Sequence, residues 1–478
     1  MATGLVIFIF LIGSLGPMVG EQVPRPWFFL ALMATLVAVS WAFFVMLESR
    51  LEKTGRTRHI LRAERLLSVS RAAVVGMHAY GVFALQWAAS ARAAVGGLPV
   101  IDDLAVAGPA LIALVLLFAG YAPIQKRLRE AVLFRFLHEG RPIGRALTRW
   151  QLVWEHVRHS ILLALVPLML LRAWIECGGL ATQWLGLTGE AAGWVELGWQ
   201  VVGVFVVLAF SPWLLRFVWD TVPLEGGELR DRVERVLSRN RVSARNVLVW
   251  QTSSGVLNGA LMGVVPMARY VLFTDALLQL LPVRQVEAVA AHEAGHGRMK
   301  HLPWLLGSMM AAALLFAMAF EVLARALDLP QNMEWSLVGV GASVLGAVLT
   351  LGFVSRRFEL QADAFAVADL SRHPEPLSAD DAGGAAVVPI ASDAVTAESV
   401  AAMNAALGAV SELNGVPRNR FTWRHGTIAW RQEHLESLVG TRLEALPIDA
   451  TVRWIKWGTL VAVALAVGLI VAMGFMPA

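Results

Sequence analysis

Trp335–Ala366 reads WSLVGVGASVLGAVLTLGFVSRRFELQADAFA. Its first part, Trp335–Val354, contains no charged residue and is long enough to cross the hydrocarbon core of a bilayer as a helix, which takes about 20 residues. After Ser355 come two arginines, and then the acidic residues Glu359 and Asp363. An apolar helix that continues into charged sequence predicts a membrane protein with a functional site beside the bilayer.

The composition of the whole chain supports this interpretation. Of the 478 residues, 57% are hydrophobic and 16% are charged, whereas soluble domains are about 45–50% apolar and about 25% charged. About nine apolar runs are candidate spans: Leu5–Met18, Trp27–Leu47, Ala72–Ala91, Leu104–Ile124, Ser160–Ile175, Leu197–Phe217, Pro303–Leu323, Trp335–Val354 and Trp457–Met476. The first is expected to be retained, because no Lys or Arg precedes it as in a cleaved signal peptide.

The basic residues predict how these spans are oriented. Residues 48–71 and 125–159 are rich in Arg and Lys, whereas 96–103 and 177–196 contain neither. By the positive-inside rule the basic connections face the cytoplasm, and counting spans places the segments on both sides of the hairpin 303–354 there too. This placement explains the net charge of +4, so we expect no nucleic-acid partner. We expect a bacterial cytoplasmic (inner) membrane with the active site on the cytoplasmic side.

Between the spans, the sequence predicts two segments outside the membrane. The first begins with an amphipathic helix, Glu228–Arg239, and continues with strands at Asn246–Gln251 and Arg269–Phe273, separated by turns at Ser254–Gly263. A helix then follows Pro282, over residues 283–301, and Ser371–Ser399 is expected to be a surface loop. The predicted domains are 1–219 with about six spans, 220–302, the hairpin 303–354, 355–453 with the loop 371–399, and the C-terminal span 454–478.

The motif His292–Glu293–Ala294–Gly295–His296 carries the chemistry. On a helix, two imidazoles four residues apart lie on one face and can bind the same ion. Glu293 then lies beside the metal, where a carboxylate can take a proton from zinc-bound water. The chain has one cysteine, Cys177, so any metal must be bound by His and carboxylates.

A catalytic zinc usually has three protein ligands, and two arrangements of the third compete. The arrangement HExxHxxGxxH is excluded, because Met299 and Leu302 stand where it needs Gly and His, and His301 lies one residue short. The other arrangement takes a Glu from a second helix, which predicts Glu359 as the third ligand. Asp363, one turn later, is expected to accept the free N–H of a ligating His.

The motifs HEAGHGRMKH, from residue 292, and SRRFELQADAFA, from residue 355, are separated by two predicted spans. This pairing resembles the type I CAAX prenyl endoprotease and its bacterial relatives, including the HtpX-like membrane metallopeptidases, over Leu257–Leu438. The resemblance implies a predominantly α-helical polytopic membrane protein with a gluzincin-type (HExxH…ExxxD) metallopeptidase domain that contains a small β-sheet. It also implies one zinc ion as the cofactor.

Further site residues follow from this resemblance. The residues in the place of the family's Asn-Ala strand are Asn258, Gly259 and Ala260. They are expected to form an edge strand that pairs with the substrate backbone. The segment from His425 to Arg431 is similar to the family's His-Pro-x-x-x-x-Arg element, with Gly426 in place of the proline. The resemblance implies that His425 and Arg431 contact the substrate or an oxyanion.

The sequence therefore predicts a zinc metalloendopeptidase that hydrolyses peptide bonds of membrane-associated proteins or peptides by a metal-activated water. Its expected partners are the lipid bilayer and a peptide or membrane-protein substrate. One alternative is CAAX-type processing of prenylated C-terminal peptides. Another is a metal-binding scaffold or transporter without catalysis. Glu293 favours hydrolysis, because a binding site needs no carboxylate beside the metal that does not ligate it.

Overall fold

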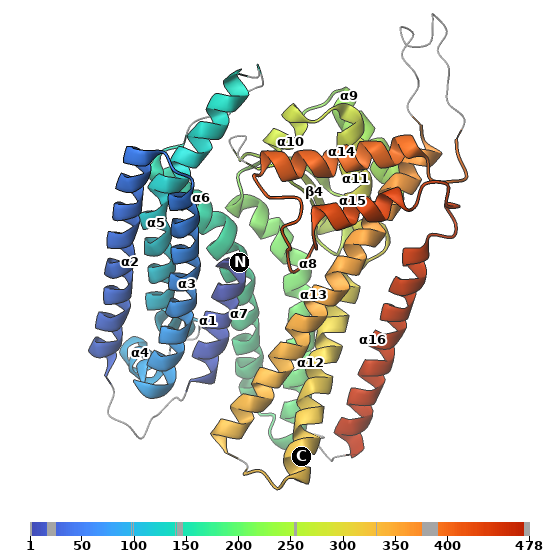
Figure 1. Cartoon of the computed structure of the whole chain (residues 1–478). Helices are drawn as coiled ribbons and strands as arrows, with labels where there is room; N and C mark the ends of the chain where they lie inside the picture. Colours follow the sequence, from blue (N-terminus) through green and yellow to red (C-terminus); the bar gives the residue numbers. More distant parts are fainter. Residues whose placement is uncertain are drawn as a thin grey trace, which may run out of the picture. The chain divides into compact units, whose positions relative to one another are not determined.

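The structure is a computed structural model that describes residues 2–16, 25–96, 98, 100–138, 140, 147–252, 256–330, 332–374 and 391–472. The chain folds into two compact units, Met1–Asp220 and Thr221–Ala478 (Figure 1). The ends of the predicted spans at Met18 and Met476, part of the predicted turns at 254–263 and most of the predicted loop 371–399 lie outside the described residues. The finer division into five domains stays a prediction.

The first unit is a set of helices packed around an apolar core. They are α1 (Ala2–Leu15), α2 (Pro26–Thr54), α3 (Arg58–Ala84), α4 (Trp87–Val95), α5 (Ile101–His138), α6 (Arg149–His156), a π-helix (Val157–Leu162), α7 (Leu163–Trp184) and α8 (Gly189–Val218). Phe29 and Phe44 of α2 and Leu117 of α5 are buried in this core. A hydrogen bond of 2.9 Å between Ser40 Oγ and Ser70 Oγ joins α2 to α3.

The second unit combines a small mixed sheet with helices. Its elements are β1 (Thr221–Pro223), α9 (Glu228–Arg239), β2 (Asn246–Trp250), β3 (Gly259–Met262), a 3-10 turn (Pro266–Ala268), β4 (Tyr270–Thr274), α10 (Asp275–Leu280), α11 (Val283–Arg298), α12 (His301–Ala326), α13 (Met333–Arg372), α14 (Ala397–Leu413), α15 (Ile428–Glu436) and α16 (Pro447–Ala472). The strand order is β1-β2-β4-β3, with β2 and β4 parallel and the other pairs antiparallel. Strand β3 is therefore an edge strand, and it packs against α11.

Three long helices of this unit, α12, α13 and α16, run side by side (Figure 1). By length and apolar composition, seven helices qualify as membrane spans: α2, α3, α5, the run from α6 to α7, α12, α13 and α16. Helix α8 is an eighth if its two parts, bent by 44°, count as one span. The predicted first span is a shorter apolar helix, Thr3–Leu15. The predicted fold class, a helical polytopic membrane protein with a small sheet, is confirmed.

The predicted bounds of helices and strands agree with the structure where the residues of one segment determine its conformation. The amphipathic pattern predicted α9 with the bounds observed, and β2 and β4 begin within one residue of the predicted strands. The prediction of turns over residues 254–263 is wrong for β3, whose Gly259 begins a strand because its backbone pairs with β4. The predicted helix 283–301 is divided at Lys300, which has φ 56° and redirects the chain into α12.

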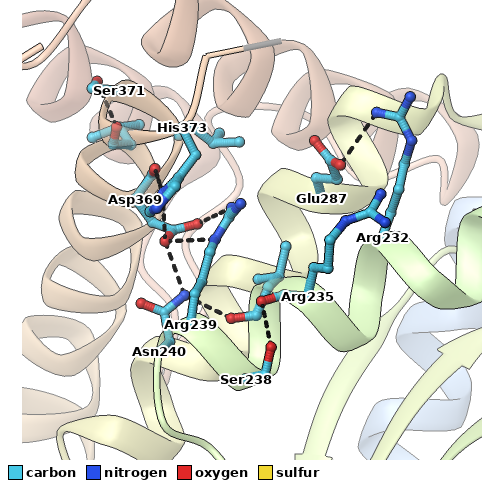
Figure 2. A network of polar contacts seen from close by, with 12 residues as sticks. Arg232, Arg235, Ser238, Arg239, Asn240, Glu287, Asp369, Ser371 and His373 are labelled. Atoms are coloured by element: carbon cyan, nitrogen blue, oxygen red, sulfur yellow. Dashed lines mark hydrogen bonds and ion pairs between the residues drawn. The ribbon is translucent and has the colours of Figure 1, made fainter. Parts of the chain in front are cut away.

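Helix α9 connects to both helices that carry the predicted metal ligands. Asp369 of α13 is 3% exposed, and Arg239 donates to its two carboxylate oxygens at 3.0 and 2.5 Å. Asn240 Nδ2 donates to the same carboxylate at 2.9 Å (Figure 2). Arg232 of α9 pairs with Glu287 of α11 at 3.3 Å. These contacts neutralise buried charge and fix α11 and α13 against a common helix.

Candidate metal centre

His292 and His296 lie one turn apart on α11, and their Nε2 atoms are 3.1 Å apart. Ligand atoms about 2.0–2.1 Å from a tetrahedral zinc are roughly 3.3 Å apart, so the two imidazoles already have the separation that one ion requires. Gly295 lets α13 approach this helix, because an added Cβ would lie 3.3 Å from Ala362 Cα and 3.1 Å from a ring carbon of Phe365.

Glu359 of α13 completes a group of three possible ligands. Its Oε2 lies 3.8 Å from His292 Nε2, and its Oε1 lies 3.7 Å from His296 Nε2. One ligand atom from each of the three side chains lies within 4.8 Å of the others. Two imidazoles and a carboxylate are a donor set of catalytic zinc sites, so these residues fit that ion.

The electrostatics of the two imidazoles agree with this fit. Burial, and then the neighbouring His292, lowers the pKa of His296 well below its usual value, so this ring is neutral and its lone pair is available. Burial also opposes the charged form of His292, but Asp363 and Glu359 outweigh it and raise the pKa of His292. A metal cation would replace that proton, because ligating imidazoles must be deprotonated.

Asp363 and Arg431 form the support behind the predicted ligands. Asp363 Oδ1 lies 2.9 Å from His292 Nδ1, on the side of the ring opposite to the predicted metal. Arg431 donates to both oxygens of Asp363 at 2.7 Å, and its Nη1 lies 3.1 Å from Glu359 Oε2. Burial opposes the charge on Arg431, but Asp363 and Glu359 outweigh it and raise its pKa. The structure thus places Arg431 between two carboxylates.

Glu293 points from α11 towards strand β3. Its Oε2 accepts a hydrogen bond of 2.7 Å from the backbone N–H of Leu261. The side chain is not among the group of possible ligands, and burial raises the pKa of its carboxyl. It lies next to the two histidines, where a carboxylate can exchange a proton with a water between them.

A cavity of about 960 Å³ opens beside Glu293 and is lined by Asn258, Gly259 and Ala260 among others. Thr274 N donates to Asn258 O at 3.0 Å. Alternate residues of an antiparallel strand bond the same neighbour, so Ala260 bonds β4 while Gly259 and Leu261 turn their backbone groups away from it. This edge faces α11 and can receive an extended peptide.

His425 reaches the site from the turn before α15. Its Nδ1 lies 3.0 Å from Glu359 Oε1, and its side chain is 50% exposed. Gly426 has φ +74°, which proline cannot adopt because its ring fixes φ near −65°. Reciprocal backbone hydrogen bonds of 3.1 and 3.0 Å between Thr422 and Gly426 close the turn, so this chain holds His425 without the proline.

Two side chains near the site carried no predicted role. His301 Nδ1 lies 2.8 Å from His296 Nδ1, and His301 Nε2 lies 2.9 Å from Gln361 Oε1. By its spacing, His301 lies one residue short of a third His ligand, and the sequence predicted no supporting role for it. Its burial, at 3% exposed, depends on the chain reversal at Lys300, which no sequence pattern indicated.

Comparison with known proteins supports the resemblance stated above. Residues 223–380 match the sequence profile of peptidase family M48. The chain is 27% identical to the "CAAX prenyl protease 1 homolog" of Arabidopsis thaliana over 176 residues, or 34% of this chain and 42% of that protein. It is 28% identical to the "Protease HtpX homolog" of Aeropyrum pernix over 190 residues, or 37% of this chain and 59% of that protein. The crystal structure of S. mikatae Ste24p aligns with a TM-score of 0.45 at 16% identity, over 87% of this chain and 100% of that one.

The matched residues include every predicted metal ligand and the strands β2, β3 and β4 beside them. The chain spans less than two thirds of the length of the two curated relatives, at 42% and 59%. Residues 223–380 are therefore the part of this chain that is similar to peptidase family M48.

Proposed function

We propose that this chain is an integral membrane zinc metalloendopeptidase that hydrolyses peptide bonds of membrane-associated proteins or peptides. One observation carries the proposal. His292, His296 and Glu359 converge within 4.8 Å, and the carboxylate of Glu293, which is not one of these three, lies beside them at the wall of a cavity. A metal-binding site alone needs the three ligands, whereas hydrolysis also needs a base.

The residues have separate tasks in this proposal. His292, His296 and Glu359 would hold one zinc ion, which supplies Lewis acidity and lowers the pKa of a bound water. Glu293 accepts a proton from the attacking water and returns it to the leaving amine nitrogen. Asp363 holds the ring of His292, and Arg431 holds Asp363 and Glu359 in place.

The substrate backbone would add to the edge of β3 as an extended strand. Gly259 and Leu261 face away from β4, which puts their backbone groups on the side of the cavity. Asn258 is exposed and lines the same cavity, so its amide can bond a substrate carbonyl or N–H. His425, half exposed at the other side of Glu359, would contact the substrate beyond the scissile bond. The site is expected on the cytoplasmic side of a bacterial inner membrane.

CAAX-type processing of prenylated C-terminal peptides is the second candidate function. The name of the Arabidopsis thaliana relative, a CAAX prenyl protease 1 homolog, favours it, and it uses the same residues. A non-catalytic scaffold or transporter is disfavoured by Glu293, which has no task in such a protein.

Purified full-length protein in detergent tests the proposal. We expect the wild type and Glu293→Gln to bind one zinc each by elemental analysis, and His296→Ala to bind none. Only the wild type should cleave casein or a prenylated peptide, because losing a general base costs about 10²–10⁴ in rate. Equal cleavage by Glu293→Gln would rule out the mechanism, and exclusive cleavage of the prenylated peptide would select the second candidate.

A further inference from the structure

A line of hydrogen-bonded polar groups leads from His296 to the C-terminal helix. His296 Nδ1 lies 2.8 Å from His301 Nδ1, and His301 Nε2 lies 2.9 Å from Gln361 Oε1. Gln361 Nε2 then donates to Asp449 Oδ1 at 2.6 Å. His301 and Gln361 are 3% and 5% exposed, so these groups are largely withdrawn from water. The line joins four elements of the second unit: α11, α12, α13 and α16.

The chemistry of the last group fixes the direction of every hydrogen bond. An ionised carboxylate only accepts hydrogen bonds, so Gln361 must turn its NH₂ group to Asp449 and its carbonyl oxygen to His301. His301 then carries its proton on Nε2 and accepts at Nδ1. His296 must therefore carry its proton on Nδ1, which leaves the lone pair of Nε2 directed at His292 and Glu359.

Helix α16 is fixed in this position by contacts other than the line itself. Thr459 Oγ1 and Ser308 Oγ are 2.7 Å apart and join α16 to α12. Lys456 Nζ donates to the carbonyl of Met299 at 3.3 Å and lies 5.5 Å from the centre of the Trp304 ring. Asp449 is thus held by a helix with its own attachments, as a group that orients others must be.

The geometry points to a positioning role for Asp449, Gln361 and His301: together they set the tautomer and ring orientation of His296, so that Nε2 faces the metal. This inference rests on the proposed metal site. It also assigns a task to the C-terminal helix, which the sequence alone left open. His292 has the carboxylate of Asp363 directly at its Nδ1. His296 is connected to the carboxylate of Asp449 through two further side chains, His301 and Gln361.

Zinc affinity measures this role directly, by competition with a chromophoric chelator on the full-length protein in detergent. Replacing a group that orients a metal ligand typically weakens metal binding about 10–100-fold. We expect a loss in that range for His301→Phe, which keeps the stack on Phe358, whose ring centroid is 4.4 Å away, but has no ring nitrogen. Gln361→Met should lose a similar amount, and Asp449→Asn less, because an asparagine oxygen can still accept.

A compensating pair separates orientation from mere packing. Gln361→Glu alone places two carboxylates against each other and should weaken zinc binding. Adding Asp449→Asn restores a donor opposite each acceptor. The amide at position 449 then donates to the carboxylate at position 361, and that carboxylate accepts from His301. We expect the double variant to bind zinc within a few-fold of the wild type.

Thr459→Val is the matched control, because it removes a buried hydrogen bond of α16 outside the line. Its loss of zinc affinity should be much smaller than that of Gln361→Met, because Lys456 still attaches α16 to Met299 and Trp304. Equal losses for Thr459→Val and Gln361→Met, or no recovery in the double variant, would overturn the inference while the wild type still binds zinc. If the wild type binds zinc no better than His296→Ala, the proposed metal site itself is wrong and the positioning role falls with it.

Discussion

Arg431 is the residue on which two carboxylates of the site depend. It donates to Asp363 and lies 3.1 Å from Glu359, and its side chain is only 10% exposed. Removing one partner of a buried ion pair leaves an uncompensated charge. The planar fork of an arginine can serve two acceptors at once, which the single ammonium of a lysine does less well.

We therefore expect Arg431→Met to reduce the free energy of unfolding by about 3–5 kcal/mol, with a smaller loss for Arg431→Lys. Thermal unfolding of the chelator-treated protein measures this, because the comparison then excludes any contribution of zinc. Unchanged stability in Arg431→Met would mean that the two carboxylates are protonated or solvated in the folded protein.

Glu293, in contrast to Arg431, is expected to lower the stability of the metal-free protein at neutral pH. Burial raises the pKa of its carboxyl above the ordinary value of 4.5, so above that pH the folded state binds more protons than the unfolded state. Stability is then lost as the pH rises from 4.5 through the raised pKa. A glutamine at this position keeps an oxygen for the N–H of Leu261 and carries no charge.

Metal-free Glu293→Gln should consequently be more stable than the metal-free wild type at pH 7, by on the order of 1 kcal/mol. The difference should disappear below the ordinary pKa of a glutamate, where both side chains are neutral. Unfolding midpoints across this pH range test the prediction. A variant that is less stable at pH 7 would show that the charged form is the favoured one in the folded chain.

At the scale of elements, α9 acts as the common support of α11 and α13. Its Arg239 pairs with Asp369, which is 3% exposed, whereas Arg235, one turn earlier on α9, is exposed and has no ion pair among the described residues (Figure 2). The two arginines form a matched pair on one helix.

Arg239→Met is expected to lower the free energy of unfolding by roughly 2–3 kcal/mol, below the range for fully buried pairs because Arg239 is partly exposed. Arg235→Met should change it by less than about 0.5 kcal/mol, as for most surface substitutions. Denaturant unfolding in detergent distinguishes the two. Similar losses for both variants would mean that α9 is not held by the Asp369 contact.

Strand β3 is positioned by the absence of a side chain at Gly259. A Cβ there would lie 2.8 Å from Val289 Cγ1 of α11 and 3.5 Å from Glu293 Oε1. Valine in a helix has essentially one side-chain rotamer, so Val289 cannot move aside. Strand β3 would then have to shift away from Glu293, the proposed general base.

Gly259→Ala should lower kcat/KM about tenfold or more, as overpacking that costs 1–3 kcal/mol would. Val289→Ala combined with Gly259→Ala should recover part of the activity, because it removes the clashing methyl groups. Peptidase assays of the two single variants and the double variant give this comparison. A double variant as inactive as Gly259→Ala would place the effect in the backbone of β3 instead.

At the scale of the whole molecule, the sequence predicts best what adjacent residues decide together. The apolar runs, the helix α9 and the spacing of His292 and His296 each depend on one segment, and the structure has most of them near the predicted positions. The predicted span Ala72–Ala91 is an exception, because it crosses the end of α3 at Ala84 and the start of α4 at Trp87. The position of Glu359 followed from chemistry and not from periodicity, since a site with two histidines requires a third ligand.

The contacts that the sequence did not predict join residues far apart in the chain. Arg431 and Asp363 are 68 residues apart, and Gln361 and Asp449 are 88 residues apart. Strand β3 has a glycine start and no alternation of its own, so no local pattern indicated it, and the expectation of an edge strand there came from the family resemblance alone. Such contacts depend on the packing of whole helices, which no local pattern contains.

Helix α13 is continuous from Met333 to Arg372, so its apolar part and Glu359 belong to one rigid rod. Trp335–Val354 is about 30 Å long, at 1.5 Å a residue, and Glu359 follows Val354 by five residues. A span that is too long or too short for its bilayer adjusts by tilting, and a rod without a hinge passes that tilt to its far end. Catalytic rate should therefore vary with the acyl-chain length of the lipids in which the protein is reconstituted, even for a short soluble peptide that never enters the membrane.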